Sequence, residues 1–285
     1  MKFGPVAVSE ATGAILAHSV ALPKGRLRKG VTLDAAAIKT LQDAGITDVT
    51  VARLDPDDVH EDDAATLLAQ ALVPDPKASQ LRLAPASTGR VNIYATGNGV
   101  AKIDAAKINS VNAVHSMVTV ATVPEWQRMT ARGMVATVKI ISYALPRQTV
   151  TDACSIGQDA LRLCPVMRKK AALIQTDVGG ADDGSKGQRA MMMRFDRLGV
   201  AMGPKTMVPH KIDTLRDALT AAEPDYDILC ILTGSATSDL YDVAPEAVRA
   251  AGGEVVHYGM PVDPGNLLFW GHLRGTPVLG LPGCA

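Results

Sequence analysis

The hydrophobic and polar positions divide the chain into three stretches of different pattern, and residues 1–73 form the first of them. This stretch predicts a small α+β domain with a helix over 32–45, a strand over 46–54 and an Ala/Leu-rich helix over 62–72. Thr32 or Asp34 could cap the first helix, and Gly45 follows it where a left-handed residue commonly ends a helix. The polar, proline-containing run 74–79 is the first linker candidate.

Residues 80–150 are predicted to form a β-rich domain. The apolar runs predict strands over 90–95, 100–103, 117–123 and 134–143, with a short helix over 104–114. Thr96-Gly97-Asn98-Gly99 stands between the first two strands and predicts a hairpin turn. We expect residues 150–166 to connect this domain to the next.

Strands and helices alternate in the third stretch, residues 168–285. Strands are predicted over 171–176, 205–208, 227–232, 254–258, 267–273 and 277–281, and helices over 188–198, 212–222 and 243–251. This alternation predicts an α/β domain with a doubly wound, mostly parallel sheet.

Composition limits the classes of function that fit the chain. It has 285 residues, enough for two or three domains, and 47% of them are apolar. The 29 basic and 29 acidic residues cancel, which argues against nucleic-acid binding. No apolar run approaches the length of a membrane span, and the N-terminus lacks the layout of a signal peptide. We therefore expect a cytoplasmic protein with a small-molecule ligand and neither a membrane nor a nucleic-acid partner.

The cysteines and histidines give little evidence for a metal or a disulfide. The four cysteines show no C-x-x-C pair, and the six histidines have no metal-ligand spacing. Cys230 lies in an apolar strand and is interpreted as a core thiol. Nothing in the sequence pairs a base with Cys284, so a catalytic thiol there is unsupported.

The loop 233–242 carries the strongest candidate chemistry. It follows the strand over 227–232 and supplies the hydroxyls of Thr233, Ser235, Thr237 and Ser238 together with Gly234 and Asp242. Ligands of open parallel sheets bind at the carboxyl ends of strands, where small residues allow backbone N–H groups to approach an anion. The alternative is an ordinary turn in which Asp242 caps the next helix.

Three further loops follow strands of the same domain. Thr176 and Asp177 begin a Gly/Asp-rich loop that lacks the spacing of a P-loop or a dinucleotide fingerprint. Pro264–Gly265 and Pro282–Gly283 are in the first instance turn signals. If all these loops lie at one edge of the sheet, they could form one pocket.

Residues 168–285 resemble the molybdopterin-binding domain of molybdenum-cofactor biosynthesis proteins. The family's T-G-G, S-x-G and acidic-aromatic-Asp steps correspond to Thr233–Ser235, Thr237–Asp239 and Leu240–Asp242, and its K-P-G and L-P-G-N-P turns to Asp263–Gly265 and Leu281–Ala285. The order and spacing of these pieces agree. Residues 1–73 look like the small domains that accompany the molybdotransferase branch.

The resemblance implies a function in molybdopterin binding, with molybdate insertion or molybdopterin adenylylation as the reaction. Asp242 and Asp177 would be catalytic, and Asp242 would also hold Mg²⁺ or position molybdate. The residues expected to bind the pterin or its phosphate, or to line the pocket, are Thr176, Thr233, Gly234, Ser235, Ser238, Pro264, Gly265, Pro282 and Gly283. We also expect a homo-oligomer.

The sequence departs from the family pattern at several of these positions. Ser235 and Asp239 replace glycines, Asp263 replaces the lysine of K-P-G, and the opening loop 175–179 matches only loosely. The loss of this lysine removes a cation from a site that binds an anionic ligand. A non-catalytic molybdopterin carrier or sensor is therefore the alternative function. An enzyme acting on another nucleotide or phosphorylated substrate is a third. The family continues into a helix where this sequence stops, which indicates a truncated chain or an unusual end of the fold.

Overall fold

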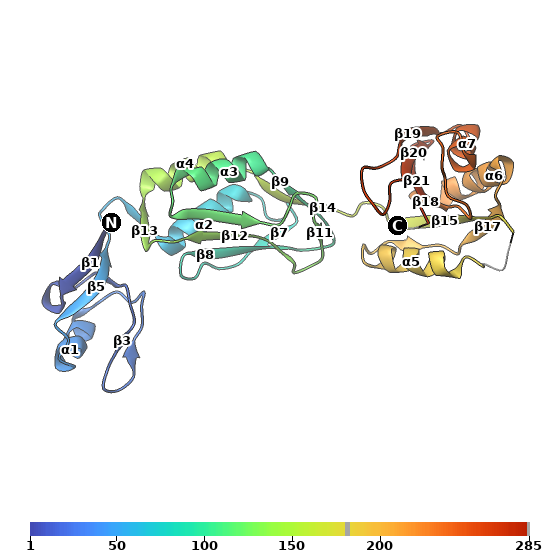
Figure 1. The fold of residues 1–285 in the computed structure, drawn as a ribbon. Helices are drawn as coiled ribbons and strands as arrows, with labels where there is room; N and C mark the ends of the chain where they lie inside the picture. Colours follow the sequence, from blue (N-terminus) through green and yellow to red (C-terminus); the bar gives the residue numbers. More distant parts are fainter. Residues whose placement is uncertain (180–182, 284–285) are drawn as a thin grey trace. The chain divides into compact units, whose positions relative to one another are not determined.

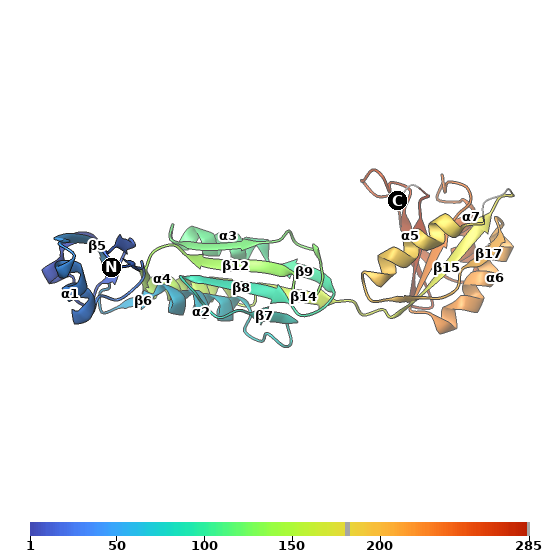
Figure 2. The same cartoon turned by 90° about the horizontal axis from the view of Figure 1, so that it is seen from below.

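The structure is a computed structural model that describes residues 1–179 and 183–283. The chain forms two compact units, Met1–Pro165 and Val166–Ala285, called here the N-terminal unit and the C-terminal unit. Figures 1 and 2 show the elements of each unit in two views. No helix within the described ranges has the length and apolar character that crossing a bilayer requires.

The beginning of the N-terminal unit contains a three-stranded antiparallel sheet in the order β1-β5-β2. Its elements are β1 (Lys2–Ala7), the short 3-10 helix η1 (Val8–Glu10), β2 (Ile15–Leu16), the β3 (Val20–Ala21) and β4 (Arg26–Leu27) hairpin, α1 (Ala35–Asp43) and β5 (Asp48–Arg53). Asp34 Oδ1 accepts a hydrogen bond from the backbone N–H of Ala37 at 2.8 Å, which fixes the start of α1. Gly45 has a φ of +72°, as expected after the end of the helix. The predicted helix and the strand after it are confirmed.

The remainder of the N-terminal unit has its own hydrophobic core beneath two sheets. One sheet has the order β10-β12-β8-β7, the other β11-β9-β14, and β6 pairs with β13. The elements are β6 (Asp58–His60), α2 (Glu61–Leu72), β7 (Leu81–Leu83), β8 (Arg90–Ala95), β9 (Gly99–Ile103), α3 (Ala105–Val114), β10 (Val118–Thr122), β11 (Arg128–Met129), β12 (Met134–Ile140), β13 (Ala144–Pro146), α4 (Arg147–Gly157) and β14 (Leu161–Pro165). Helices α2, α3 and α4 contribute Leu68, Val111 and Ala153 to this core.

Two expectations for this region are wrong. β8 and β9 belong to different sheets, so residues 96–99 do not form a hairpin turn between paired strands. Instead, Thr96 binds Gln80 O through both its N–H and its hydroxyl, and β9 pairs with the distant strand β14. Gly99 allows that pairing, because a Cβ there would overlap the carbonyl of Cys164. Residues 150–166 are not a simple connection, since they contain most of α4 and all of β14.

The C-terminal unit is built on one seven-stranded sheet. It is a mixed α/β structure, as the sequence predicts. The order is β16-β15-β18-β21-β20-β19, and β17 also pairs with β15. Its elements are β15 (Lys170–Asp177), α5 (Ser185–Asp196), β16 (Ala201–Met202), β17 (Thr206–Pro209), α6 (Ile212–Ala222), the 3-10 helix η2 (Glu223–Asp225), β18 (Ile228–Leu232), α7 (Val243–Ala250), β19 (Glu254–Tyr258), β20 (Phe269–Leu273) and β21 (Thr276–Leu281). β15 to β18 and β21 are parallel, whereas β19 and β20 join them as an antiparallel hairpin at one edge.

Helices cover both faces of this sheet (Figure 1). Leu173 and Cys230 face one side, where they pack with Phe195 of α5. Their neighbours along the strands, Ile174 and Ile231, face the opposite side with the apolar residues of α6 and α7. Burial raises the pKa of the Cys230 thiol to about 12, so its interpretation as a core thiol is confirmed.

Gly280 provides a test of how tightly the core of the C-terminal unit is packed. Phe269 is fully buried, and a Cβ on Gly280 would overlap its ring. We expect Gly280→Ala to lower the free energy of unfolding by about 1–3 kcal/mol, measured by urea denaturation. Gly283→Ala is the matched control, because a Cβ there meets nothing within 4 Å. Equal stability of the two variants would contradict the packing described here.

Candidate functional site

The register of the parallel strands brings three of the predicted loops to one edge of the sheet. Gln175 of β15 lies opposite Leu232 of β18, and Leu232 lies opposite Leu281 of β21. Thr176 near the end of β15 and the first residues after β18 and β21, Thr233 and Pro282, therefore lie side by side. The β19–β20 hairpin loop is at the same edge, because Phe269 pairs with both Tyr258 and Gly280. This edge is called the carboxyl edge.

Thr176 is the point at which two of these loops are joined. Its side chain is 3% exposed, and its Oγ1 accepts a hydrogen bond from the backbone N–H of Gly234 at 3.0 Å. The same oxygen lies 2.8 Å from Nδ1 of His210, the residue directly after β17. A Cβ on Gly234 would be 2.6 Å from the carbonyl oxygen of Thr176, so only glycine allows this close approach. The hydroxyl thus ties the end of β15 to the loops after β17 and β18.

The loop 233–242 is closed on itself by Asp242. Its Oδ1 accepts from the N–H of Val243 at 2.7 Å and its Oδ2 from the N–H of Ser238 at 3.0 Å. The first bond makes Asp242 the N-cap of α7. Both carboxylate oxygens are therefore engaged in holding the loop, which is the structural interpretation that the sequence left open. Its role toward a metal or a reacting group stays a prediction.

Hydroxyl groups of the loop itself and of Tyr258 also hold the loop backbone. Thr233 Oγ1 donates to Ser235 O at 2.5 Å and lies 3.3 Å from Oγ1 of Thr237, which is 7% exposed. Tyr258, the last residue of β19, donates its hydroxyl to the carbonyl of Thr237 at 2.7 Å. The loop backbone is thus fixed by contacts on two sides, while the side chains of Ser235 and Ser238 are exposed.

The other predicted site residues also lie at the carboxyl edge. Asp177 is exposed, and its Oδ1 accepts from the N–H of Gly179 at 2.8 Å in a local turn. Pro264 and Gly265 are in the loop of the β19–β20 hairpin, where Gly265 has a φ of +117°. Pro282 is buried and Gly283 exposed, directly after β21. Cys284 lies outside the described residues.

A buried amide lies next to this group. Gln175 is 4% exposed, and its Oε1 has no hydrogen-bond partner within the described ranges. Its side chain lies under the start of α5, because a Cβ on Gly184 or Gly187 would come within 2.7 Å of its amide. An unpaired buried acceptor costs about 1–3 kcal/mol, and this oxygen is one such acceptor next to the carboxyl edge.

The charged groups near the carboxyl edge include Lys205, whose Nζ donates to the carbonyl of Asp183. Lys211 follows His210 after β17 and forms no ion pair with any described residue. Nearby, hydrogen bonds from Ser185 lower the pKa of the exposed Asp183 carboxyl. No group of three or more His, Cys, Asp or Glu side chains in the described part of the chain is arranged to hold a metal ion.

Sequence reasoning singled out Thr176, Thr233 and Gly234 but missed the supporting side chains. His210 and Tyr258 reach the site from strands far away in sequence, and Gln175 has the appearance of a core strand residue. One signal in the sequence could have identified them, namely a polar residue near or just beyond the end of a strand. Gln175, His210 and Tyr258 all have this position. Which loop each one contacts depends on strand order.

Comparisons with known proteins give two kinds of finding. A family model for a domain of unknown function, DUF8806, matches residues 5–53, which are confined to the N-terminal unit. A comparison with curated proteins gives no match.

Among solved structures, the chain is similar to molybdenum-cofactor proteins of Pyrococcus. A molybdopterin biosynthesis MoeA protein from Pyrococcus horikoshii shares 13% identity at a TM-score of 0.34, over 99% of this chain and 70% of that one. A molybdenum cofactor biosynthesis protein from Pyrococcus furiosus shares 14% identity at 0.25, over 99% and 56%. A MoeA protein from strain OT3 of P. horikoshii shares 15% identity at 0.26, over 99% and 69%. At such identities and TM-scores these names are not carried over to this chain.

Tyr258 makes the support of the loop testable through pH. Burial raises the pKa of its hydroxyl above the ordinary value near 10, and the carboxylates of Asp239 and Asp242 raise it further. Above pH 10 the folded protein then retains a proton that the unfolded chain loses, so this contribution to stability falls as pH rises. We expect Tyr258→Phe to cost about 1 kcal/mol at pH 7, and the difference from the wild type to shrink above pH 10.

Urea unfolding at intervals between pH 7 and pH 11 measures both effects. Tyr241→Phe is the control, because Tyr241 is 73% exposed and its hydroxyl makes no hydrogen bond to the described residues. A difference between wild type and Tyr258→Phe that stays constant over this range would contradict the pH argument.

Proposed function

We propose that the C-terminal unit is a doubly wound domain that binds molybdopterin at its carboxyl edge, in molybdenum-cofactor biosynthesis. The proposal rests on the sequence resemblance of residues 168–285 together with one observation. That observation is the contact between Thr176 Oγ1 and the Gly234 N–H, which joins the carboxyl end of β15 to the loop after β18. Two segments that the resemblance assigns to one ligand are thereby in direct contact.

The residues have separate roles in this proposal. Ser235 and Ser238 present exposed hydroxyls to the pterin or its phosphate, and Gly234 allows the backbone to come close to it. Thr176 and Thr233 hold the loop backbones in position. Pro264–Gly265 and Pro282–Gly283 form the walls, and Asp177 and Asp242 stand on either side of the joined loops.

The chemistry of the donors fits an organic ligand better than a metal ion. Gln175 Oε1 is a buried acceptor without a described partner, and a pterin carries N–H donors. Lys211 supplies a cation at the carboxyl edge, but at the opposite end of the sheet from Asp263, which has replaced the family's lysine. Both oxygens of Asp242 already accept backbone hydrogen bonds, so we assign no step to Mg²⁺.

The second candidate function is that of a carrier or sensor, which binds molybdopterin without converting it. The altered positions Ser235, Asp239 and Asp263, and the structural engagement of Asp242, favour a molybdopterin carrier or sensor over an enzyme. Adenylylation with ATP and insertion of molybdate are the two enzymatic alternatives. In each case we expect a cytoplasmic homo-oligomer.

Calorimetric titration of the full chain with molybdopterin and with its adenylylated form tests the proposal. Ser235→Ala and Ser238→Ala change no described side-chain hydrogen bond, so a lost contact to the ligand should weaken binding about tenfold without unfolding the loop. Ser155→Ala, an exposed serine of α4, is the control and should bind like the wild type.

The outcomes separate the candidates. Binding followed by turnover of ATP or molybdate supports an enzyme, and binding without turnover supports a carrier. Absence of binding by either pterin would refute the proposal, and a panel of nucleotides would then test the third function. Binding that neither serine variant weakens would remove the loop 233–242 from the ligand site.

Gln175 gives an independent test of the buried part of the site. Replacement by Met keeps the volume but removes the unpaired oxygen, so we expect Gln175→Met to raise the free energy of unfolding without ligand by about 1 kcal/mol. The same variant should bind molybdopterin less tightly if a ligand donor meets this oxygen. Urea denaturation with and without the pterin distinguishes the two effects, and a loss of stability without ligand would show that the amide is already satisfied.

A further inference from the structure

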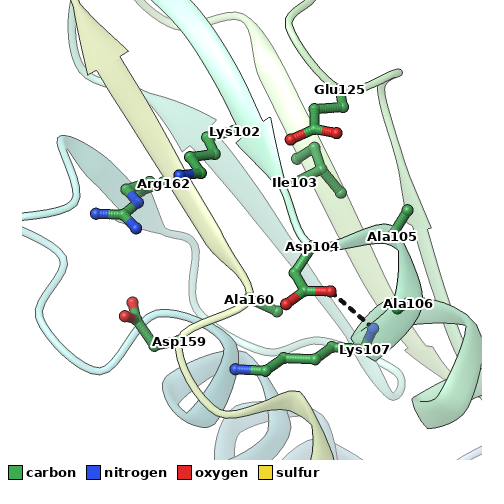
Figure 3. A pocket seen from close by; sticks show the side chains of 10 residues that line it. All are labelled: Lys102, Ile103, Asp104, Ala105, Ala106, Lys107, Glu125, Asp159, Ala160 and Arg162. Atoms are coloured by element: carbon green, nitrogen blue, oxygen red, sulfur yellow. Dashed lines mark hydrogen bonds between the residues drawn. The ribbon is translucent and has the colours of Figure 1, made fainter.

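A second candidate site lies in the N-terminal unit, and none of its lining residues belongs to the proposed molybdopterin site. A cavity of about 560 Å³ lies against β9, β14 and the start of α3. It is lined by Lys102, Ile103, Asp104, Ala105, Ala106, Lys107, Glu125, Asp159, Ala160 and Arg162 (Figure 3). Its volume is in the range of small-molecule sites, and six of its ten lining residues are charged.

Two of these charges form an unfavourable pair in the sheet. Lys102 of β9 and Arg162 of β14 are directly opposite each other in the antiparallel register. Ala101, Ile103, Leu161 and Leu163 beside them are buried in the core, so the alternation of the strands puts both cations on the outer face. Like charges opposite each other destabilise a sheet, and neither has an ion-pair partner among the described residues.

A third cation is held in place beside them. Lys107 Nζ donates to the backbone carbonyl of Gln158 at 2.7 Å, which leaves it two further N–H donors. The position of Lys107 is fixed in turn by α3, since its own N–H donates to Asp104 Oδ1 at 3.0 Å. Figure 3 shows this bond at the base of the cavity. Asp104 is thus occupied as the cap of α3, whereas the ammonium of Lys107 can take an anion.

None of the three carboxylates of the lining forms an ion pair with a described residue, and two of them, Asp159 and Glu125, also cap no helix. Asp159 is anchored through its backbone N–H to Ala71 O at 2.9 Å, and its φ is +54°. Glu125 precedes Trp126, whose N–H donates to Ala101 O at 2.7 Å. The ring of Trp126 lies 6.0 Å from the ammonium of Lys102. Both carboxylates are therefore carried on fixed backbone, and both can accept hydrogen bonds.

We propose that this cavity binds a small phosphate monoester whose organic part carries hydroxyl groups, that is, a sugar phosphate. Arg162 and Lys102 would hold the phosphate, with Lys107 as a third donor, because guanidinium binds phosphate oxygens in a bidentate manner. Asp159 and Glu125 would accept from the hydroxyls. A ligand that is only an anion would pair with the cations but would be repelled by the carboxylates that face it. The ligand therefore needs both a phosphate and hydroxyl groups.

Calorimetric titration of the full chain with ribose 5-phosphate, ribose and inorganic phosphate tests this proposal. We expect ribose 5-phosphate to bind at least tenfold more tightly than inorganic phosphate, and ribose not to bind measurably. Arg162→Gln and Lys102→Gln should each weaken ribose 5-phosphate at least tenfold. Asp159→Asn should weaken ribose 5-phosphate but not inorganic phosphate.

Arg128→Gln is the matched control, because Arg128 is an exposed arginine of the same sheet that does not line the cavity. Arg162→Gln also removes one of two like charges that lie opposite each other. The melting temperature of this variant without ligand should therefore equal or exceed that of the wild type. Such a result would show that weaker binding by the variant does not come from a loss of folding. Absence of ribose 5-phosphate binding, or a loss as large in Arg128→Gln as in Arg162→Gln, would overturn the proposal. Equal affinity for inorganic phosphate would overturn the assignment of the carboxylates. The proposed molybdopterin site is tested separately, by molybdopterin binding to Ser235→Ala. The sugar-phosphate proposal and the molybdopterin proposal can therefore fail independently.

Discussion

The parallel register of β15, β18 and β21 is the constraint on which the candidate molybdopterin site depends. Gln175, Leu232 and Leu281 lie in one row across the sheet, so the last residues of β15 lie beside the loops that follow β18 and β21. A shift of β18 by one residue would turn its buried Leu229 and Ile231 toward the opposite face and would also move Gly234 away from Thr176. The packing of aliphatic side chains on both faces therefore fixes the position of a hydrogen bond at the edge.

The joined loops show how the same residue can serve structure and function. The sequence resemblance predicts a catalytic and metal-binding role for Asp242. In the structure, however, both of its carboxylate oxygens accept hydrogen bonds from backbone N–H groups. That engagement holds Ser235 and Ser238 in an exposed, fixed loop, which is what a binding site needs in order to avoid an entropic cost on binding. The structural interpretation of Asp242 and a binding role for its loop are compatible, whereas a direct metal role for its carboxylate competes with the cap.

Local signals in the sequence predict the helices well, because the determinants of a helix lie within a few residues. Asp34, Asp104 and Asp242 each cap a helix, and Gly45 follows the end of one. The loop residues Thr176, Thr233 and Gly234 were recognisable for a similar reason, as polar or small residues after apolar strands. Residues 96–99 show the limit of this reasoning. Their composition suits a hairpin turn, but the partner of β9 is a strand about 60 positions later, and no local pattern gives that pairing.

The same limit explains why the cavity of the N-terminal unit was not predicted. Lys102 and Arg162 each occupy an ordinary outward position of an alternating strand, and each alone reads as a solvated charge. Only the register between β9 and β14 sets one cation directly opposite the other. The two candidate sites thus differ in physical kind. At the carboxyl edge, Thr176, Thr233 and Asp242 are hydrogen-bonded within the site, and Gln175 Oε1 is a buried acceptor without a described partner. In the cavity, Lys102 and Arg162 lie opposite each other, and neither forms an ion pair with a described residue. The proposed sugar phosphate matches this arrangement because it carries both an anion for the cations and hydroxyl donors for the carboxylates beside them.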